Sequence, residues 1–524
     1  MRNSGFFFLL VLVFSISGTF AQVKSRRLTP PLNHPSMNYW APFVSLDGNT
    51  LIYCSDEGED NAMALFYSTR DGVIWKEPSL LPRSINVRLT FLKGYTLSPD
   101  GKTLYLTSMK SGGIGGYDIL VSEWRGNTWS EPANPGTPLN SAQHDSSPTI
   151  SPDGTQMFFM RCGSMDFSKA SDCRIFTARR TGNGRWSEPE ELPSTINTGN
   201  SQMPRICGDG ETLIFSSDRF APNKGGMDLY LTRRSNGSWS QPLALDFVNT
   251  PSEDQFVSVT SSGRYLLRDT PGQRKSELVE YQFPSETRPM GATMVLGKAE
   301  GLAGSTGYVS VYSVSKGRRL SNLTTDRDGK FTVYLKEGDR YDISVEHESE
   351  AVSYLFKRID LTGERNQPVE RMTGTMGQLT SGMEIPFQSL SFEPGTAQLS
   401  TTSLVEMEKL GRLMHGNPAR SFQLDLTLQG YRTDSVATDP DLTEVIIDTV
   451  RMEIEFAVDS VTTGTRDTLI VKRTYHNNRT KAQAEAIRSA LLTKGVLPEQ
   501  LTVSLHVTEA LPEERKVLGR FIVR

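Results

Sequence analysis

Cysteine is the residue type in this chain whose spacing most directly suggests chemistry. The four cysteines are Cys54, Cys162, Cys173 and Cys207, and the second and third flank the short loop GSMDFSKASD. In an exported protein, two cysteines that close a loop of this length favour a disulfide bond. The alternative is a pair of buried free thiols. No CxxC motif and no cluster of histidine with cysteine indicates zinc, so we expect no metal and no cofactor.

Residues suited to hydrolytic chemistry are sparse. The chain has six histidines and no GxSxG motif, the mark of an α/β-hydrolase nucleophile. His144, in the stretch QHDSSP, is the histidine nearest to a repeated segment. Its neighbours suggest a charged pair, but a contact within a loop is the better interpretation. We therefore expect a protein that is not an enzyme.

The first residues, MRNSGFFFLLVLVFSISGTFAQ, have the features of an export signal. Arg2 precedes an apolar run, and Thr19-Phe20-Ala21 fits a cleavage site, so residues 1–21 are expected to be removed. A short membrane anchor is the alternative, but the run is too short to span a bilayer comfortably. No cysteine follows the cleavage site, so we expect a soluble exported protein without an N-terminal lipid.

The charge balance argues against nucleic acid as a partner. The 524 residues carry a formal net charge of −4, and no long block of lysine and arginine is present. A nucleic-acid-binding surface would need concentrated positive charge. We therefore look to proteins, peptides or glycans for partners.

The elements that position these residues recur with a period near 53 residues. Asp-Gly pairs fall at 47/48, 100/101, 153/154 and 209/210, each between alternating apolar residues, and a weaker fifth unit is FVSVTSSGRYLLRD. Asp-Gly suits a tight turn between two strands. A third strand follows each turn, and a fourth opens at Trp75, Trp129, Trp186 and Trp239. Four strands repeated radially predict a β-propeller, with the tryptophans in packing positions.

Residues from about 37 to 284 resemble the PD40 family of WD40-like propeller repeats, of the TolB type, and the propeller domain is expected over 22–284. SPDGKTLYLTS and SPDGTQMFFM are close matches, and turn, strand and tryptophan recur in register. Five blades are counted, and a sixth made from the two ends is left open. Such propellers offer a face to protein partners. The alternative is a propeller enzyme acting on glycans or peptides, which an acidic or histidine-bearing cluster at the central channel would favour.

Residues 291–363 form a second domain of short alternating strands, which predicts a small β-sandwich. The stretch TTDRDGKFTVYLKEGDRYDISVE resembles carboxypeptidase-regulatory-like domains, whose implied role is a spacer or an adhesive module. Asp326 and Asp328 have a superficial likeness to a calcium loop, but later acidic ligands are missing, so a hairpin turn is expected. Residues 364–383 are polar and are interpreted as a linker.

Residues 384–524 alternate strand and helix. A helix is expected after Ser403, with Glu406 completing a capping box and Leu404 on its apolar face, and a second helix covers AQAEAIRSALLTKG. The turn GYRTDS, the helix start RTKAQAEAI and the closing ERKV resemble the OmpA-like, peptidoglycan-associated fold. The fold class is therefore multidomain and mainly β: a propeller, a sandwich and an α/β domain.

In that family, a turn aspartate and a helix arginine hold the charged ends of the diaminopimelate in the wall peptide. The resemblance puts Asp434 in the first role and Gln483 in the second, with Arg432, Arg479 and Arg515 as further candidates. Glutamine can hydrogen-bond a carboxylate but brings no charge, so binding is weakened by roughly 1.5–3 kcal/mol. An inserted hairpin, about 436–476, is expected at the mouth of the site. Wall binding, a protein partner and a purely structural role all stay open.

This order of domains resembles envelope proteins of the Bacteroidota. Among them is the wall-associated subunit of the type IX secretion system, which also has a lipidation cysteine and a helical-repeat segment that this chain lacks. The resemblance implies a periplasmic scaffold at the outer membrane or cell wall. Its partners would be envelope proteins of the outer membrane or a secretion complex, with peptidoglycan as a further ligand.

Overall fold

The computed structural model describes residues 24–56, 63–86, 94–109, 112–166, 169–272, 275–302, 304–347, 354–363, 367–385, 390–393, 396–415, 417–431, 437, 444–457, 463–476, 480–509 and 516–524. The chain divides into two compact units, Met1–Gly291 and Ala292–Arg524. The predicted signal, residues 1–21, lies outside the described residues. No helix in the described part of the chain is long and apolar enough to cross a membrane.

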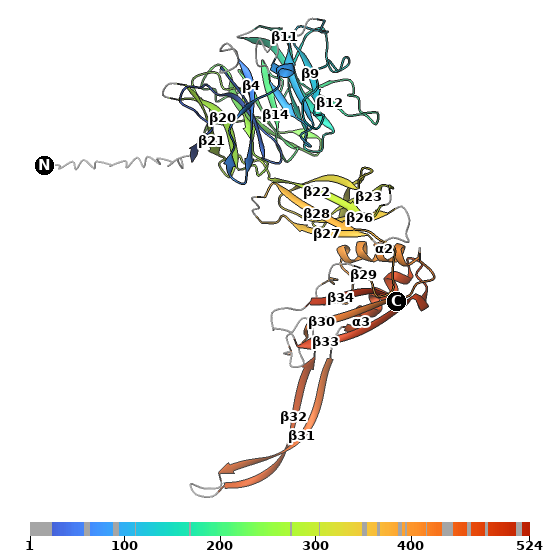
Figure 1. Ribbon diagram of the computed structural model, residues 1–524. Helices are drawn as coiled ribbons and strands as arrows, with labels where there is room; N and C mark the ends of the chain where they lie inside the picture. The colour runs from blue at the N-terminus through green and yellow to red at the C-terminus, as the bar shows by residue number, and fades with distance from the viewer. Residues whose placement is uncertain are drawn as a thin grey trace, which may run out of the picture. The chain divides into compact units, whose positions relative to one another are not determined.

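The described residues of the first unit form five antiparallel sheets, as Figure 1 shows. The first sheet consists of β2 (Trp40–Val44), β3 (Thr50–Ser55), β4 (Ala64–Asp71), β5 (Ile74–Trp75) and β6 (Ser79–Leu80), followed by the short helix α1 (Arg83–Asn86). The second consists of β7 (Tyr95–Leu97), β8 (Thr103–Ser108) and β9 (Asp118–Glu123). The third consists of β10 (His144–Ile150), β11 (Gln156–Met165), β12 (Ala170–Arg179) and β13 (Glu190–Glu191). The fourth consists of β14 (Ser201–Ile206), β15 (Thr212–Ser217), β16 (Asp228–Ser235), β17 (Ser238–Trp239) and β18 (Leu243–Ala244).

The fifth sheet joins the two ends of this unit. It has the order β1-β21-β20-β19, from β1 (Ser25–Arg27), β19 (Ser258–Val259), β20 (Tyr265–Pro271) and β21 (Ser276–Gln282). The first strands of neighbouring sheets contact one another, as β7 and β10, β10 and β14, and β2 and β19 do. This is the predicted propeller, and the two ends meet within one of its five sheets.

The Asp-Gly pairs form the turns that the sequence predicts. The Asp47, Asp100, Asp153 and Asp209 carboxylates each accept the backbone N–H two residues on. The glycine that follows each aspartate has φ between 66° and 73°, where other residues are strained. The first two strands of each repeat are thereby held in a fixed register.

The four repeated tryptophans are half-buried and pack against apolar cores between strands. An arginine guanidinium lies over three of the rings, at 5.1 Å for Trp75, 5.1 Å for Trp186 and 5.4 Å for Trp239. These contacts cover the ring faces, as expected for packing residues.

The second unit begins with a sandwich of two sheets. One has the order β25-β22-β28, from β22 (Ala292–Glu300), β25 (Lys330–Lys336) and β28 (Val369–Thr375). The other has the order β24-β23-β26-β27, from β23 (Gly307–Ser313), β24 (Arg318–Thr324), β26 (Arg340–His347) and β27 (Leu355–Asp360). The interpretation of 364–383 as a linker is wrong, because β28 pairs in parallel with β22 along seven residues, and the sandwich continues past residue 363.

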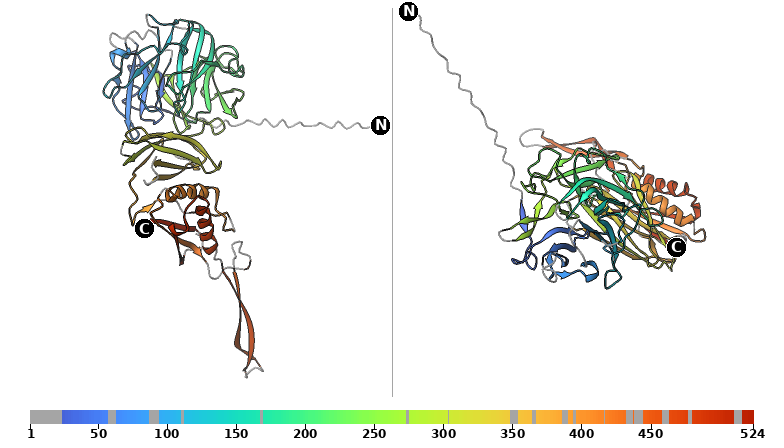
Figure 2. Two further views of the ribbon diagram at one scale, coloured as in Figure 1. Left: turned by 90° about the vertical axis from the view of Figure 1, so that its right-hand side faces the viewer. Right: turned by 90° about the horizontal axis from the view of Figure 1, so that it is seen from above.

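The C-terminal domain is a sheet of order β29-β34-β30-β33 with two helices. Its elements are β29 (Glu384–Ile385), α2 (Thr401–His415), β30 (Phe422–Tyr431), α3 (Thr480–Leu492), the 3-10 turn η2 (Pro498–Gln500), β33 (Leu501–Glu509) and β34 (Lys516–Val523). α2 and α3 contact each other, and α3 covers β30 and β33 (Figure 2). Met407, Leu410, Ile487, Leu491 and Phe521 are at the centre of its core.

The start of α2 differs from the prediction. The helix begins at Thr401, and the Ser400 hydroxyl, not that of Ser403, accepts a backbone N–H of the first turn. Ser403 instead exchanges hydrogen bonds with the Ser391 backbone, and Leu404 is 49% exposed. The prediction of a capping box is wrong, because the Glu406 carboxylate contacts Tyr354 and Lys409 and not the start of the helix.

Candidate functional site

Of the five residues predicted at a wall-peptide site, Gln483 alone is among the described residues. Asp434, Arg432, Arg479 and Arg515 lie outside them. Gln483 lies in the second turn of α3 and is 9% exposed. Its Oε1 atom has no hydrogen-bond partner among the described residues. The position that the resemblance assigns to arginine thus holds a buried, neutral acceptor.

The arginine that α3 does contain is poorly placed to replace that charge. Arg488 follows Gln483 by five residues, which is roughly 140° around a helix. The two side chains therefore leave different faces of α3. An amide alone can donate or accept hydrogen bonds, but it cannot form the charged fork that holds a carboxylate.

The inserted segment forms the predicted hairpin. β31 (Glu444–Ala457) and β32 (Thr463–His476) pair in register over their full length and form a sheet of their own. In both Figure 1 and the left view of Figure 2, this ribbon extends away from the C-terminal sheet. A two-stranded ribbon is marginally stable in water without further packing.

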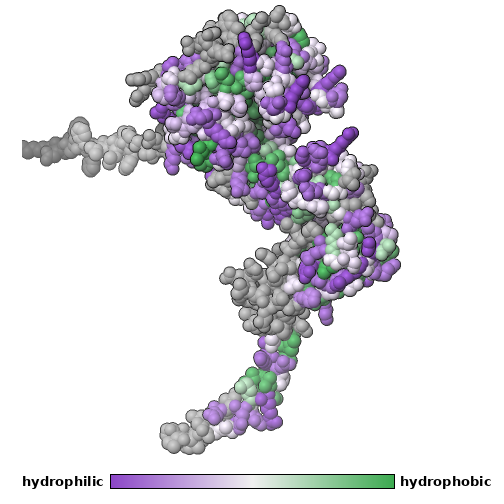
Figure 3. All heavy atoms as spheres, viewed as in Figure 1, coloured by the Kyte–Doolittle hydropathy of each residue, from purple (hydrophilic) through white to green (hydrophobic). Residues whose placement is uncertain are grey.

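This ribbon exposes large apolar side chains on both faces. Some of them are visible on the side of the ribbon that Figure 3 shows. Val450 and Ile470 lie opposite each other on one face, and Leu469 and Val471 lie on the other, where Leu469 is 68% exposed. The full apolar set, termed here the ribbon patch, is Val445, Ile446, Ile447, Val450, Met452, Leu469, Ile470 and Val471. A concentration of exposed apolar residues on a free strand pair is typical of a protein interface.

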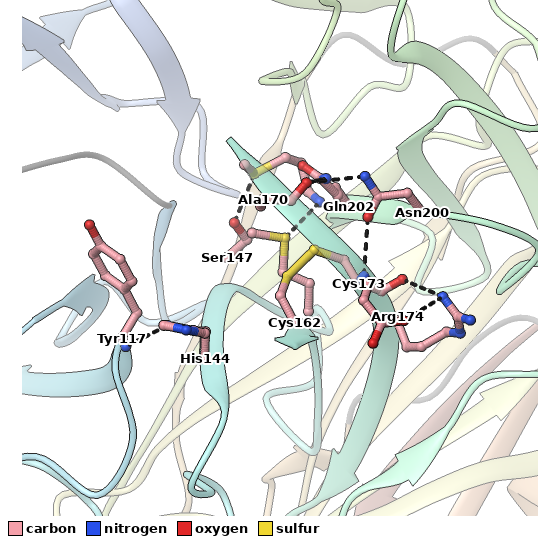
Figure 4. The surroundings of a disulfide bond; sticks show 12 residues. Tyr117, His144, Ser147, Cys162, Ala170, Cys173, Arg174, Asn200 and Gln202 are labelled. Carbon is pink, nitrogen blue, oxygen red and sulfur yellow. Dashed lines mark hydrogen bonds and ion pairs between the residues drawn. A yellow bond between two sulfur atoms is a disulfide. The ribbon is translucent and has the colours of Figure 1, made fainter. Parts of the chain in front are cut away.

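A disulfide bond joins Cys162 and Cys173 in the third propeller sheet, as Figure 4 shows. The two residues are direct cross-strand partners, and both are fully buried. Asn200 and Gln202, on the next sheet, donate hydrogen bonds to the Ala170 carbonyl on the same hairpin. The other two cysteines, Cys54 and Cys207, are free and buried.

Removing this disulfide is expected to destabilise the propeller. For a closed loop of this size, the constraint on the unfolded chain contributes about 2–3 kcal/mol. The double variant Cys162→Ala and Cys173→Ala should lower the free energy of unfolding by that amount in oxidising buffer, measured by urea denaturation. Reduced wild-type protein should resemble the variant. Equal midpoints for the variant and the oxidised wild type would contradict the prediction.

His144 is the first residue of β10, and its partner is not in its own segment but in the loop before β9, 27 residues earlier. Its Nδ1 atom accepts the Tyr117 backbone N–H at 3.2 Å (Figure 4). The charged pair belongs to its neighbour: the Asp145 carboxylate, fully buried, is 2.6 Å from Arg161 Nε on the adjacent strand. The fifth sheet repeats the arrangement with Asp254 and Arg268, 2.7 Å apart.

A second buried charge cluster lies where the sandwich meets α2. Glu406 Oε2 is 3.5 Å from Lys409 Nζ, and both side chains are almost completely buried. The Tyr354 hydroxyl donates to Glu406 Oε1 at 3.0 Å, and the Lys409 ammonium lies over the Phe356 ring. Burial raises the pKa of Glu406, and Lys409 opposes that shift. The sequence placed Glu406 in a cap and gave no signal for this contact between domains.

The enzyme hypothesis would be favoured by acidic or histidine side chains lining the central channel of the propeller. The larger cavity there is lined by Thr96, Thr149 and Ser258 among other residues, and its charged residue is Arg205. The described residues lining this cavity and its neighbour include no carboxylate and no imidazole. The feature named as favouring a glycan or peptide hydrolase is thus not found among them.

Comparisons with known proteins find similar folds for part of the chain. No family model and no curated protein matches. A putative TolB from Agrobacterium tumefaciens is 16% identical, with a TM-score of 0.30, over 57% of this chain and 90% of that one. TolB from Acinetobacter baumannii is 16% identical, with a TM-score of 0.27, over 58% and 64%.

A GH62 α-L-arabinofuranosidase catalytic domain from Coprinopsis cinerea is also similar. It is 11% identical, with a TM-score of 0.31, over 50% of this chain and 96% of that one. Proteins named as TolB and as arabinofuranosidase both occur among the similar structures.

Proposed function

We propose that this protein is an exported, non-catalytic scaffold of the bacterial envelope that binds other proteins. The observation that carries the proposal is the ribbon patch, whose apolar side chains are 37–68% exposed on a hairpin to which no further strand of the described residues pairs. Burying such a patch against a partner gains roughly 25 cal/mol per Å² of apolar area. The partner would thereby stabilise a ribbon that is marginal alone.

Three further observations support the proposal. The N-terminal sequence has the features of an export signal, and a disulfide bond suits an oxidising compartment. The propeller repeats offer a rigid platform for further protein contacts. The order of the domains, which resembles that of envelope proteins of the Bacteroidota, supports a place within a type IX secretion or related envelope complex.

A wall-facing role is the weaker part of the proposal. Gln483 is neutral and buried where the peptidoglycan-associated fold needs a guanidinium, so any hold on the wall peptide lacks its second charge. We therefore propose that the C-terminal domain presents the ribbon to a protein and contacts peptidoglycan weakly.

Site-specific photo-crosslinking in the native host tests the proposal. A photoreactive residue at Leu469 or Ile447, both in the ribbon patch, should join the full chain to one discrete envelope protein. The same residue at Leu404, an exposed apolar position on α2, is the matched control and should give no product. Equal products at all three positions, or none, would overturn the proposal.

A further inference from the structure

Five equivalent positions, one in each propeller sheet, meet around one cavity. They are Phe43, Thr96, Thr149, Arg205 and Ser258, and all five line a space of about 50 Å³. Because each comes from the first strand of its sheet, the cavity lies on the propeller's central channel. We call these residues the channel ring.

In three of the sheets, a bulge in the first strand of the repeat precedes the channel-ring residue. Two residues before the ring position, φ is positive at Ala41, Ser147 and Met203, with values of 48°, 52° and 49°. The register of the first strand pair shifts at the same place in these three sheets. Such bulges re-aim the following side chain. Three costly non-glycine conformations at matched positions indicate that the geometry of the ring is built into the fold.

One end of the cavity is narrow and the other reaches the Asp-Gly turns. A smaller space of about 10 Å³ adjoins it, lined by Gly94, Ser147, Met203 and Phe256, and Arg205 lines both spaces. At the other end, Leu46, Pro99 and Pro152, which precede the turn aspartates, line the larger cavity. A ligand would enter from the side of these turns.

Arg205 is the charged member of the channel ring, and its charge is not compensated. Its Nε donates to the Val257 carbonyl at 3.1 Å, and Nη2 lies 3.5 Å from the Tyr95 carbonyl oxygen. Nη1 is buried and has no partner among the described residues, which include no carboxylate at ion-pair distance. Burial lowers the pKa of this guanidinium to about 10. An unpaired buried charge is costly, and a bound anion would offset that cost.

The hydroxyl members of the ring add donors. Thr149 Oγ1 accepts the Ile206 N–H at 3.3 Å, and Ser258 Oγ accepts the Val44 N–H at 2.9 Å. Neither hydroxyl hydrogen has an acceptor among the described residues. Each hydroxyl therefore keeps an O–H to donate, alongside the Arg205 guanidinium that also lines the cavity.

We propose that the channel ring is a binding site for a carboxylate group, held by the Arg205 guanidinium and assisted by the hydroxyls of Thr149 and Ser258. One positive charge matches a monoanion and leaves a phosphate dianion unbalanced. A planar carboxylate fits the guanidinium, and the apolar ring of Phe43, 5.1 Å from the Arg205 guanidinium, suits a short hydrocarbon stem. The cavity holds only a small group, so the ligand is a short carboxylic acid or the carboxylate end of a narrow chain.

The test is saturation-transfer difference NMR on the full chain, with propionate as the probe. Wild type should saturate the propionate methyl, and Arg205→Met should weaken binding at least tenfold, as expected for a lost charge-assisted contact. Arg205→Met should fold, because replacing an unpaired buried charge with an apolar side chain of similar length is neutral or stabilising. Arg179→Met, at an exposed arginine on β12, is the matched control and should bind as wild type does.

Trialanine, compared with propionate, distinguishes the two sources of a carboxylate, a short free acid and the end of a peptide chain. A signal from both propionate and trialanine assigns the site to any short acid. A signal from trialanine alone assigns it to the end of a chain. Either outcome supports the proposal if the signal is lost in Arg205→Met. No signal from either acid would overturn the proposal. So would equal signals in wild type and Arg205→Met, or displacement of propionate by inorganic phosphate at lower concentration than by acetate.

Discussion

Asp145→Ala is expected to lower the free energy of unfolding of the propeller by about 3–5 kcal/mol, the usual cost of removing one member of a buried ion pair. The Asp145 carboxylate accepts the Ser141 backbone N–H at 2.6 Å, the Ser141 hydroxyl at 2.7 Å and Arg161 Nε at 2.6 Å. The variant loses all three contacts. It also leaves the Arg161 guanidinium, whose side chain is 16% exposed, without a counter-charge.

Urea denaturation, followed by tryptophan fluorescence, measures this effect. Arg26→Ala is the matched control within the same unit, because it breaks an ion pair with Glu280 whose arginine is 74% exposed. Exposed pairs contribute about 0–1 kcal/mol, so the control should unfold nearly as wild type does. The double variant Asp145→Ala and Arg161→Met should recover part of the loss. A loss below about 1 kcal/mol for Asp145→Ala would contradict this account of the pair.

Lys409→Met is expected to destabilise the second unit by a similar amount, about 3–5 kcal/mol at neutral pH. The substitution leaves the buried Glu406 carboxylate with the Tyr354 hydroxyl as its remaining partner. The double variant Glu406→Gln and Lys409→Met removes both charges and should regain most of the loss, because a buried pair replaced by neutral groups is often nearly neutral.

The pH dependence gives this prediction a second, independent readout. Burial raises the pKa of Glu406 above its ordinary 4.5, so the folded state favours the protonated acid. The stabilisation that protonated Glu406 gives the folded state is therefore fully present below pH 4.5, and it is lost as the pH rises through the raised pKa of this carboxyl. The difference in the free energy of unfolding between Lys409→Met and the double variant should therefore decrease toward pH 4, as measured by urea denaturation. A gap that widens on acidification would contradict the assignment.

The parts of the fold that the sequence predicted are those with local signals. Asp-Gly turns between alternating apolar residues predicted the propeller strands, because turn chemistry and period-2 alternation act over a few residues. The hairpin of β31 and β32 was predicted from two alternating runs, but the turn expected at TTGT was misplaced, because Thr463, Gly464 and Thr465 pair within β32. The two helices of the C-terminal domain followed from apolar spacing.

The parts that were missed depend on partners distant in the chain. β28 has a polar sequence and is a strand because β22 supplies its hydrogen bonds, so its composition suggested a linker. Glu406 is satisfied by Tyr354, 52 residues earlier, which no capping pattern could indicate. The channel ring needed the register of all five sheets, since its members are more than 50 residues apart in neighbouring repeats.

The candidate sites divide in the same way. A resemblance of motifs pointed to Asp434 and Gln483, and the second is a buried amide whose Oε1 atom has no partner in the described part of the chain. The hairpin was expected to offer an edge to a partner, but the exposure of its apolar residues depends on the sheet having two strands among the described residues, which the sequence does not indicate.

Co-sedimentation of the full chain with purified peptidoglycan sacculi is the most direct test of the central claim. That claim is that this protein binds other proteins and does not bind peptidoglycan firmly. Wild type and Asp434→Ala should remain equally in the supernatant, because the neutral amide of Gln483 cannot form the charged fork that a firm hold on the diaminopimelate carboxylate needs. Gln483→Arg should increase sedimentation if the missing charge is what limits binding. Strong sedimentation of wild type that diaminopimelate competes away and that Asp434→Ala abolishes would contradict the account.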